Sequence, residues 1–249
     1  LVRLASRWDL SLAVLHFDHR LRGEASRQDL EFVAALARRY GLPFHSGAAD
    51  VAELARRSRD NLEQAARRAR REFFLRFLRS GQLDRIALGH TRSDQAETVL
   101  FRLLRGSGTT GLAGIRPVTS EGFVRPLIET SREEVERFLA QEGLEWRLDH
   151  TNLDLRLARN RIRLQLLPEL RQQWNPAIEK VLAQTALLAQ EDEEYWEQET
   201  SRLAGQLFTV REGAWIVRAA SLASLPRAVS RRLIRKAIAS VGGSLRRWE

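Results

Sequence analysis

The stretch Gly89-His90-Thr91-Arg92-Ser93-Asp94-Gln95-Ala96-Glu97-Thr98 decides the fold of this chain. It follows a short apolar run, 86–88, that reads as a buried strand, and it opens a helix. Residues three apart on a helix share a face, so Asp94 and Glu97 are expected side by side. Open α/β sheets bind their ligands at the carboxyl ends of their strands, where His90 lies. We therefore predict that these three side chains converge in a site.

A glycine-rich turn, Arg105-Gly106-Ser107-Gly108, closes the same helix. Such turns can hold a phosphate on their backbone N–H groups. Acids near a nucleotide typically bind a divalent cation or orient a nucleophile, and a histidine at a strand end can stabilise developing negative charge. The simpler interpretation is a strand-end histidine with two acids that favour a helix N-terminus. The combination with the glycine-rich turn favours a functional site.

Short apolar strands and amphipathic helices alternate on both sides of this stretch. Strands are expected at 12–17, 43–45 and 84–88 with a further extended segment at 123–127, and helices are expected at 26–40, 61–81 and 131–143. Three helix starts have sequence signals: a capping box at Ser26 and Asp29, a cap at Asn61, and Ser131 with Glu134. The alternation predicts an α/β fold, a parallel sheet with helices on both faces.

The composition changes after Pro168, and the remaining chain reads as mainly helical. Asn175-Pro176 resembles an N-cap followed by proline, which predicts a long helix to about residue 203. A hairpin is expected at 207–217, with its turn at Glu212-Gly213, and a last helix at 226–241. We therefore expect a catalytic domain at 1–174 and a helical module with a small hairpin at 175–249, which we expect to contact RNA.

The composition limits the classes of function. The 249 residues carry a net charge of +9 and no cysteine, which excludes disulfides, thiolate metal sites and catalysis by a cysteine of this chain. The apolar runs are too short for a membrane span and no signal peptide opens the chain, so we expect a cytoplasmic protein. Genome composition can explain why arginine outnumbers lysine, but it does not explain the excess of positive charge. A nucleic-acid partner is therefore expected.

Two groups of arginines could hold phosphates. Arg67, Arg68, Arg70 and Arg71 lie on one expected helix, where Arg67 shares a face with Arg70 and with Arg71. The second group is Arg156, Arg159, Asn160, Arg161 and Arg163, preceded by Asp149 and Asn152. Arg159 and Arg163 form a like-charged pair four residues apart, which an anion between them would stabilise. The simpler interpretation of both groups is a solvated basic surface.

Together these motifs resemble the tRNA(Ile)-lysidine synthases. The resemblance rests on the motifs Gly-His-Thr-x-x-Asp-Gln-Ala-Glu-Thr at 89–98, Arg-Gly-Ser-Gly-x-x-Gly-Leu-x-Gly at 105–114, Arg-Pro-Leu at 125–127, Asp-x-x-Asn at 149–152, and Arg-Asn-x-x-Arg at 159–163 running into Leu-Pro-x-Leu at 167–170. It covers residues 12 to about 175 closely and the remainder loosely. Several motifs in the right order make it specific.

The resemblance implies an ATP-pyrophosphatase fold of the adenine nucleotide alpha hydrolase type. It also implies a carbon–nitrogen ligase that uses ATP and Mg²⁺ to adenylate C2 of the wobble cytidine, C34, in the isoleucine tRNA with a CAU anticodon. Free L-lysine then displaces AMP and leaves lysidine. Charge neutralisation by Mg²⁺ and arginine suits the release of pyrophosphate. The sequence leaves the oligomeric state open, including a homodimer.

The family's site residues map onto this chain by their motifs. The resemblance implies His90, Asp94 and Glu97 as catalytic residues, with Asp94 also a candidate ligand of Mg²⁺ and the acidic pair a candidate for the ammonium of lysine. For ATP it implies the turn Arg105, Gly106, Ser107 and Gly108. His19 is a further candidate for the nucleotide, because it lies just past a strand end in the same layer as His90. For the tRNA, or for the triphosphate, it implies Arg67, Arg70, Asp149, Asn152, Arg159, Asn160 and Arg163.

The chain departs from the family pattern in three ways. Arg71 and His150 stand where an aromatic residue and a proline are usual. Ser93 stands where many members have aspartate, although the second acid, Asp94, is intact. The family's Ser-Gly-Gly-x-Asp-Ser phosphate loop, on its first strand, is expected just upstream of Leu1, and the chain contains no such motif. The chain begins with Leu1, contains no methionine and ends at Glu249 without a capping residue or turn signal, so we expect both ends to be cut within a longer protein. We expect the chain by itself to have little ATP-dependent activity.

Two other functions fit part of the sequence. One is a sibling enzyme that thiolates tRNA, but such enzymes commonly use cysteines in the chain and none is present. The other is a non-catalytic remnant that binds tRNA through its basic surface. If the chain is such a non-catalytic remnant, replacement of Asp94 by alanine is expected to leave its affinity for tRNA unchanged.

Overall fold

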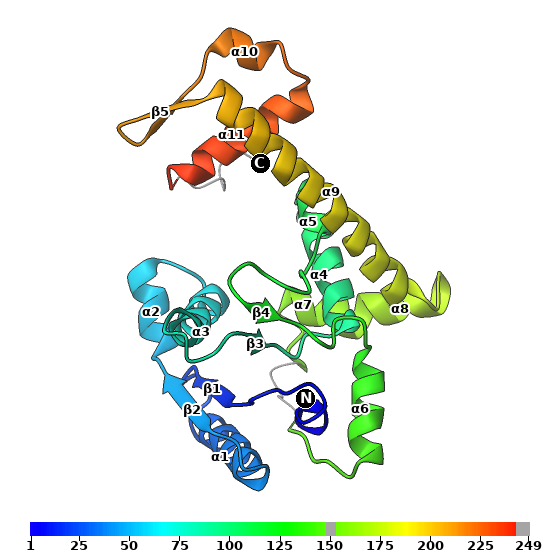
Figure 1. The fold of residues 1–249 in the computed structure, drawn as a ribbon. Coiled ribbons are helices and arrows are strands. Elements are labelled where there is room, and N and C mark those ends of the chain that lie inside the picture. Colours follow the sequence, from blue (N-terminus) through cyan, green and yellow to red (C-terminus); the bar gives the residue numbers. More distant parts are fainter. Residues whose placement is uncertain (148–152, 243–249) are drawn as a thin grey trace. The chain divides into compact units, whose positions relative to one another are not determined.

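The computed structural model describes residues 1–147 and 153–242, and its chain forms two compact units (Figure 1). The first unit consists of Leu1–Leu88, Val118–Val124 and Glu145–Leu148. The second consists of Gly89–Pro117, Arg125–Leu144 and Asp149–Glu249. The stretch that opens with Gly89 therefore begins the second unit.

Parallel strand pairs form the first unit, as the alternating pattern predicts. Its elements are η1 (Val2–Leu4), β1 (Val14–Asp18), α1 (Glu24–Arg39), β2 (Phe44–Ala48), α2 (Val51–Ser58), α3 (Leu62–Arg79), β3 (Ile86–Ala87) and β4 (Phe123–Val124). β1 pairs in parallel with β2, and β3 pairs in parallel with β4. Each pair is joined by a crossover that contains helix, which is the connection that parallel strands require. The expected α/β class is confirmed.

Aromatic side chains of α3 fill the core of this unit. Phe73, Phe74 and Leu75 are buried together with residues of β3 and β4. The ring of Phe73 lies 5.4 Å from that of Phe17 on β1. Gly47 on β2 passes so close that an added Cβ would lie 2.6 Å from the Phe73 ring. The sheet and α3 therefore approach each other through a glycine.

Helix starts in the first unit follow the sequence signals only in part. Asn61 caps α3 by accepting a hydrogen bond from the Gln64 N–H at 2.8 Å, as expected. The capping box expected at Ser26 and Asp29 is wrong, because α1 already begins at Glu24. Asp29 instead forms an ion pair with Arg22 at 2.6 Å. The sequence analysis also missed α2, which Asp50 caps.

Helices make up nearly all of the second unit. They are α4 (Arg92–Leu104), α5 (Gly108–Leu112), α6 (Arg132–Gln141), α7 (Ala158–Arg161), the π-helical turn η3 (Ile162–Leu166), α8 (Leu167–Gln173), α9 (Ile178–Leu207), α10 (Ala219–Ala223) and α11 (Arg227–Ser240). α9 packs against α4, α5, α8 and α11. Ala96 and Leu100 of α4 are buried against Ile162 and Leu167. The long helix α9 thus connects the opening motif to the C-terminal helices (Figure 1).

Local signals in the second unit give one error and two confirmations. Ser131 and Glu134 form the expected capping box of α6. The expected hairpin is present as β5 (Thr209–Arg211) and β6 (Ala214–Ile216), which are antiparallel. The N-cap expected at Asn175 is wrong, because α9 begins at Ile178 and the Asn175 Oδ1 accepts from the Ala177 N–H instead. The domain boundary expected at 174/175 falls between α8 and α9 and stays a prediction.

Within the described parts of the chain, none of the helices combines the length and the apolar surface required to span a lipid bilayer.

Candidate active site

A capping box fixes the start of the motif helix α4. The Oδ2 atom of Asp94 accepts hydrogen bonds from the N–H and the Oγ1 of Thr91, both at 2.8 Å. The Asp94 N–H in turn donates to Thr91 Oγ1 at 3.3 Å. These bonds satisfy orphan donors of the first turn. One carboxylate oxygen of Asp94 is therefore committed to the local fold.

Glu97, one turn further along α4, is the most buried charge in the site. Its side chain is only 1% exposed, and it receives two hydrogen bonds from Arg163: Nε to Oε1 at 2.6 Å and Nη2 to Oε2 at 2.9 Å. Arg159 Nε donates to Oε2 at 2.9 Å. A carboxylate removed from water requires such partners, because an unpaired buried charge is strongly destabilising.

Arg132, at the first position of α6, is a third cation at the acidic pair. Its Nη2 donates to Asp94 Oδ1 at 3.0 Å and its Nη1 lies 3.4 Å from Glu97 Oε1. Arg132 belongs to none of the motifs in the sequence. The Ser131 capping box places Arg132 at the start of α6, but no local signal places that start beside α4.

The cluster of two acids and three arginines has one positive charge in excess. Burial alone would raise the pKa of Asp94, but the hydrogen bonds from Thr91 and the charges of Arg132 and Arg159 outweigh it, so the pKa lies below its ordinary value. For Arg163, burial acts to lower the pKa, and its bonds to Glu97 raise it beyond that effect. Both groups are therefore ionised at neutral pH. Arg132 and Arg159 keep 32% and 36% of their side chains exposed, so the groups that face outward are cationic.

Ser93 occupies a structural position in the same cluster. Its Oγ accepts from the Arg132 N–H at 3.2 Å and donates to Glu179 Oε2 on α9 at 2.8 Å. Glu179 also pairs with Arg171 of α8. The serine therefore joins α4, α6 and α9 at a position where many relatives were expected to carry an acid.

Arg159 and Arg163 lie on a continuous helical segment formed by α7, η3 and α8. Arg163 falls within η3, a π-helical turn, and such turns occur frequently at functional sites. Asn160 lies between the two arginines in sequence, and its side chain is buried. Its Nδ2 donates a hydrogen bond to the carbonyl of Asp154 at 2.9 Å. This bond holds the turn before α7. Its predicted contact with RNA stays a prediction.

The other residues predicted in the second unit lie at the two ends of α4. His90 directly precedes Thr91 and is half-buried. At the far end, the N–H groups of Gly106 and Ser107 donate to carbonyls of α4, so these two donors close the helix. The Arg105 guanidinium lies over the Phe101 ring, 5.0 Å from its centroid. A phosphate at this turn stays a prediction.

Three of the predicted residues belong to the first unit. His19 directly follows β1, and Arg67 and Arg70 lie on α3. Partial burial, followed by the positive charge of Arg70, lowers the pKa of His19, so the imidazole is neutral near pH 7. Its Nδ1 is buried without a hydrogen-bond partner among the described residues. Arg68 pairs with Asp60 and Arg71 with Glu121, whereas Arg67 and Arg70 have no carboxylate within 4.0 Å in the described chain. Arg67 and Arg70, which the family resemblance implies, are therefore the two arginines of this group that lack a carboxylate partner among the described residues.

The donor atoms of this site do not fit a metal ion held by the protein alone. Among residues 1–147 and 153–242, no group of three or more His, Asp or Glu residues could hold one. Both oxygens of Asp94 already accept hydrogen bonds, and three guanidinium groups surround Asp94 and Glu97.

Two further predicted residues, Asp149 and Asn152, lie outside the described residues.

Comparisons with known proteins agree with the motifs. The PP-loop domain family matches residues 1–170. A tRNA(Ile)-lysidine synthase of Solibacter usitatus is 53% identical over 95% of this chain and 52% of its own length. One of Nostoc is 35% identical over 95% of this chain and 68% of its own length. The chain thus spans about half the length of the Solibacter relative and two thirds of the Nostoc relative.

A solved structure supports the fold alone. The U34-tRNA thiolase of Methanococcus maripaludis superimposes with a TM-score of 0.62 at 14% identity, over 76% of this chain and 66% of the other. The resemblance drawn from the motifs is confirmed by the sequence relatives. The chain belongs to the PP-loop domain family, among the tRNA(Ile)-lysidine synthases.

Proposed function

We propose that the chain carries the catalytic residues of an enzyme that joins lysine to C2 of the wobble cytidine in the CAU-anticodon isoleucine tRNA. The observation that supports this proposal is the ion-pair cluster of the second unit. Asp94 and Glu97 belong to one family motif, Arg159 and Arg163 belong to another, and the fold brings the four side chains together. Residues more than 60 positions apart in sequence thus form one site.

The proposed reaction has two transfers. The C2 oxygen of cytidine attacks the α-phosphate of ATP, and pyrophosphate leaves. The amine of lysine then forms a C–N bond at C2, the C–O bond breaks, AMP leaves with the electron pair, and the amine releases a proton. Negative charge develops on the phosphoryl oxygens in both steps, and fixed cations stabilise such charge best in a partly dehydrated site.

We assign the cationic side of the cluster to that task. Arg132 and Arg159 are partly exposed and already oriented by buried acids, so they require little reorganisation when an anion arrives. Asp94 and Glu97 then act as positioning residues for the arginines. This assignment differs from the prediction that the acidic pair binds the ammonium of lysine or a metal, because three guanidinium groups already neutralise the pair.

ATP remains part of the proposal as a reactant, and Mg²⁺ as the cation that would accompany its phosphates. Mg²⁺ commonly binds through substrate phosphates with few protein ligands, and it neutralises the charge of the leaving pyrophosphate. Arg67 and Arg70 of the first unit are candidates for the triphosphate or the tRNA backbone, and His19 is a candidate for the nucleotide. His90, which precedes the capping box, remains a candidate catalytic residue.

The experiment compares two proteins on transcribed isoleucine tRNA with ATP, Mg²⁺ and labelled lysine. One is the chain itself, and the other carries a strand and a Ser-Gly-Gly-x-Asp-Ser phosphate loop fused before Leu1. We expect lysine incorporation and AMP release from the fused protein only, and none with the elongator methionine tRNA. A folded fused protein that binds the tRNA but releases neither AMP nor pyrophosphate would contradict the proposal.

The same assay separates the two alternatives. A non-catalytic tRNA-binding protein predicts tight binding without AMP formation, and an unchanged affinity in the D94A variant. A thiolating enzyme predicts AMP release that depends on a sulfur donor rather than on lysine. This chain supplies no cysteine for such chemistry.

A further inference from the structure

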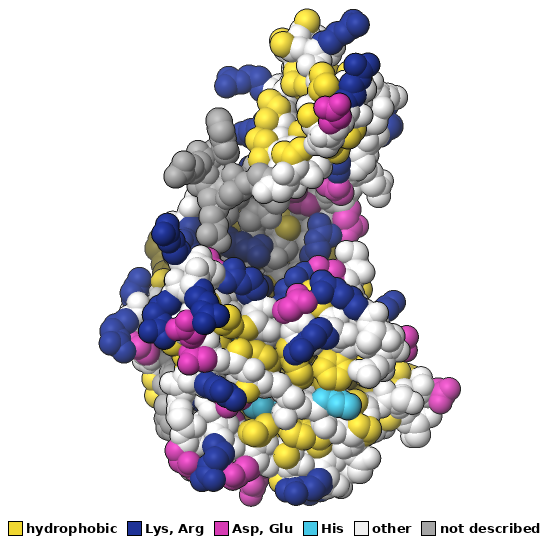
Figure 2. Space-filling model, turned by 90° about the vertical axis from the view of Figure 1, so that its left-hand side faces the viewer, with side chains coloured by type: hydrophobic (Ala, Val, Ile, Leu, Met, Phe, Trp, Pro, Cys, Tyr) yellow, Lys and Arg dark blue, Asp and Glu magenta, His cyan; other side chains and the backbone are white. Residues whose placement is uncertain are grey.

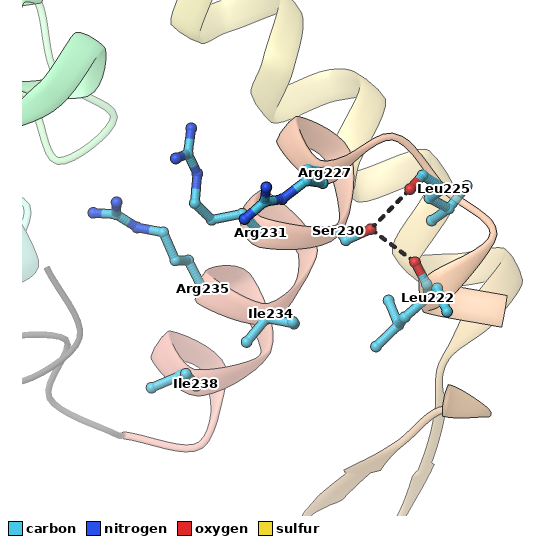
Figure 3. A pocket seen from close by; sticks show the side chains of 9 residues that line it. Leu222, Leu225, Arg227, Ser230, Arg231, Ile234, Arg235 and Ile238 are labelled. Atoms are coloured by element: carbon cyan, nitrogen blue, oxygen red, sulfur yellow. Dashed lines mark hydrogen bonds between the residues drawn. The ribbon is translucent and has the colours of Figure 1, made fainter. Parts of the chain in front are cut away.

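A pocket of about 500 Å³ lies between α10 and α11. Neither of these helices carries the acidic pair Asp94 and Glu97, which belongs to α4. Leu222, Leu225, Ile234 and Ile238 contribute apolar walls, and the arginines of α11 stand along one side (Figure 3). This volume falls in the range of small-molecule sites. Ile234 remains 45% exposed although it lines the pocket, so an apolar surface is open to a ligand.

The turn between α10 and α11 is fixed by one side chain. Ser230 Oγ donates to the carbonyl of Leu222 at 2.8 Å and lies 3.4 Å from that of Leu225. Figure 3 shows both bonds reaching from α11, one to α10 at Leu222 and one to the loop at Leu225. The walls of the pocket are therefore held in position before any ligand binds.

α11 divides its cations between two faces. On the face toward α9, Arg232 forms two hydrogen bonds with Glu193, at 2.6 and 3.0 Å, and Lys236 pairs with Glu197. Arg227 and Arg231 lie on the pocket side, and no carboxylate lies within 4.0 Å of either one in the described part of the chain. Arg232 and Lys236 therefore attach α11 to α9. Arg227 and Arg231 place two charges without a carboxylate partner, among the described residues, beside the apolar wall of the pocket.

The spacing of the pocket arginines suits a chain of anions. Arg227, Arg231 and Arg235 follow one another at four-residue intervals, so their Cα atoms rise by about 6 Å at each step along one helix face. In the part of Figure 2 that holds the C-terminal helices, hydrophobic side chains lie directly beside basic ones. A ligand that matches this surface has repeated negative charges and a flat apolar group between them.

We propose that the α10–α11 pocket binds an unpaired stretch of RNA, with phosphates on Arg227 and Arg231 and a nucleobase against Leu222 and Ile234. Only an unpaired, unstacked base exposes the faces that apolar side chains can cover. Arginine binds phosphate through a planar fork of donors. The choice of RNA over another polyanion rests on the proposed function. The pocket adds a second contact region for that substrate, on a different helix pair from the acidic cluster.

The test measures RNA binding by the full chain without ATP or lysine. Fluorescence anisotropy with a labelled single-stranded oligoribonucleotide, and with the isoleucine tRNA, is followed across a series of salt concentrations. We expect R227Q/R231Q to bind about tenfold more weakly and to lower the slope of log K against log salt by about 1.4, since each phosphate contact on a single strand contributes about 0.7. I234A is expected to weaken binding of the single strand without changing the slope.

The matched control is R27Q/R202Q, which removes the same charge from two exposed arginines that pair with glutamates of their own helices. An equal loss in this control would overturn the proposal, because the effect would then be one of net charge. Equal affinity of the chain for a duplex of the same sequence would overturn the base contact. Unchanged RNA binding in R227Q/R231Q, with loss of binding to an acidic amphipathic peptide, would assign the pocket to a protein instead.

These outcomes are independent of catalysis. If lysidine is not formed but R227Q/R231Q weakens RNA binding, the pocket assignment stands and the proposed function fails. If lysidine is formed and both variants bind RNA like the parent chain, the pocket assignment alone fails.

Discussion

Arg163 binds Glu97 through a two-point contact, with Nε 2.6 Å from Oε1 and Nη2 2.9 Å from Oε2. The carboxylate is 1% exposed and the guanidinium 20% exposed. Planar arginine matches a carboxylate in this geometry better than lysine can. The pair therefore fixes η3 against α4, and the geometry of the site depends on a charge that solvent does not reach.

Replacement of Glu97 by glutamine is expected to destabilise the fold strongly. The amide keeps the shape of the side chain but leaves the buried guanidinium groups without a counter-charge, and the loss of one partner of a buried pair costs about 3–5 kcal/mol. Urea unfolding measures the change. The control is E133Q, whose exposed carboxylate lies 3.4 Å from Arg171 and should leave the unfolding midpoint unchanged. Similar midpoints for the two variants would show that Glu97 is not a structural charge.

Arg132 and Asp94 are expected to be coupled. R132M and D94N each remove one partner of the 3.0 Å contact between α6 and α4. Contacting residues of one ion-pair network show interaction energies of about 0.5–3 kcal/mol in a double-mutant cycle. Urea unfolding of the parent, the two single variants and the double variant gives this energy. A cycle that closes at zero would remove Arg132 from the cluster.

Gly114 should tolerate alanine less well than Gly108 does. Both glycines have positive φ, +56° and +59°, so each substitution carries the left-handed penalty of about 1–2 kcal/mol. At Gly114 the new Cβ also lies 2.5 Å from Gln95 Oε1, and nothing lies within 4 Å at Gly108. Gln95 cannot easily move, because its amide bonds both the N–H and the carbonyl of Ile115. We expect the free energy of unfolding of G114A to be lower than that of G108A by a further amount of about 1–3 kcal/mol. Thermal unfolding of the two variants measures this difference.

Stability of the first unit is expected to fall with acidification. Burial lowers the pKa of His16 and His19 below the ordinary value of 6.5, so the unfolded chain binds protons that the folded chain does not. The contribution of each neutral histidine is complete above the unfolded pKa and is lost as the pH falls from about 6.5 through the folded pKa. Urea unfolding between about pH 7.5 and 5.5 measures this loss.

The variant H19N should flatten that pH dependence, and H16N/H19N should flatten it further. The asparagine does not titrate, so the folded and unfolded chains then bind the same number of protons at this position. A parent chain whose free energy of unfolding rises on acidification over the same range would contradict the assignment of neutral imidazoles.

The sequence predicts the local elements well where the signal is itself local. Asn61 caps α3 and Ser131 caps α6, because each side chain bonds to a backbone N–H three residues away. Ser26 and Asp29 have the same pattern, yet Asp29 is taken by Arg22 and by Arg147, from a segment more than 100 residues away in sequence. A long-range ion pair thus overrides a local cap, and spacing alone cannot show it.

The candidate site is likewise predictable from the sequence only where its residues lie close together along the chain. The shared helix face of Asp94 and Glu97 follows from their spacing, and the four-residue spacing of Arg159 and Arg163 predicts a pair that an anion would stabilise. The anion proves to be the acidic pair itself. Arg132 was missed because its place beside α4 depends on how α6 packs, which no periodicity encodes.

The π turn η3 has a consequence for how the chain length of this region can vary. Ile162 and Leu167 are both buried against α4, although residues five apart on an α-helix point about 140° away from each other. The wider turn restores their common phase by absorbing one residue. Deletion of an exposed residue such as Gln165 should therefore convert η3 to regular α-helix while both faces keep their partners. A deletion in a regular turn, by contrast, would rotate everything beyond it by about 100°. The helix that presents the arginines thus contains a place where evolution can remove one residue without moving the site.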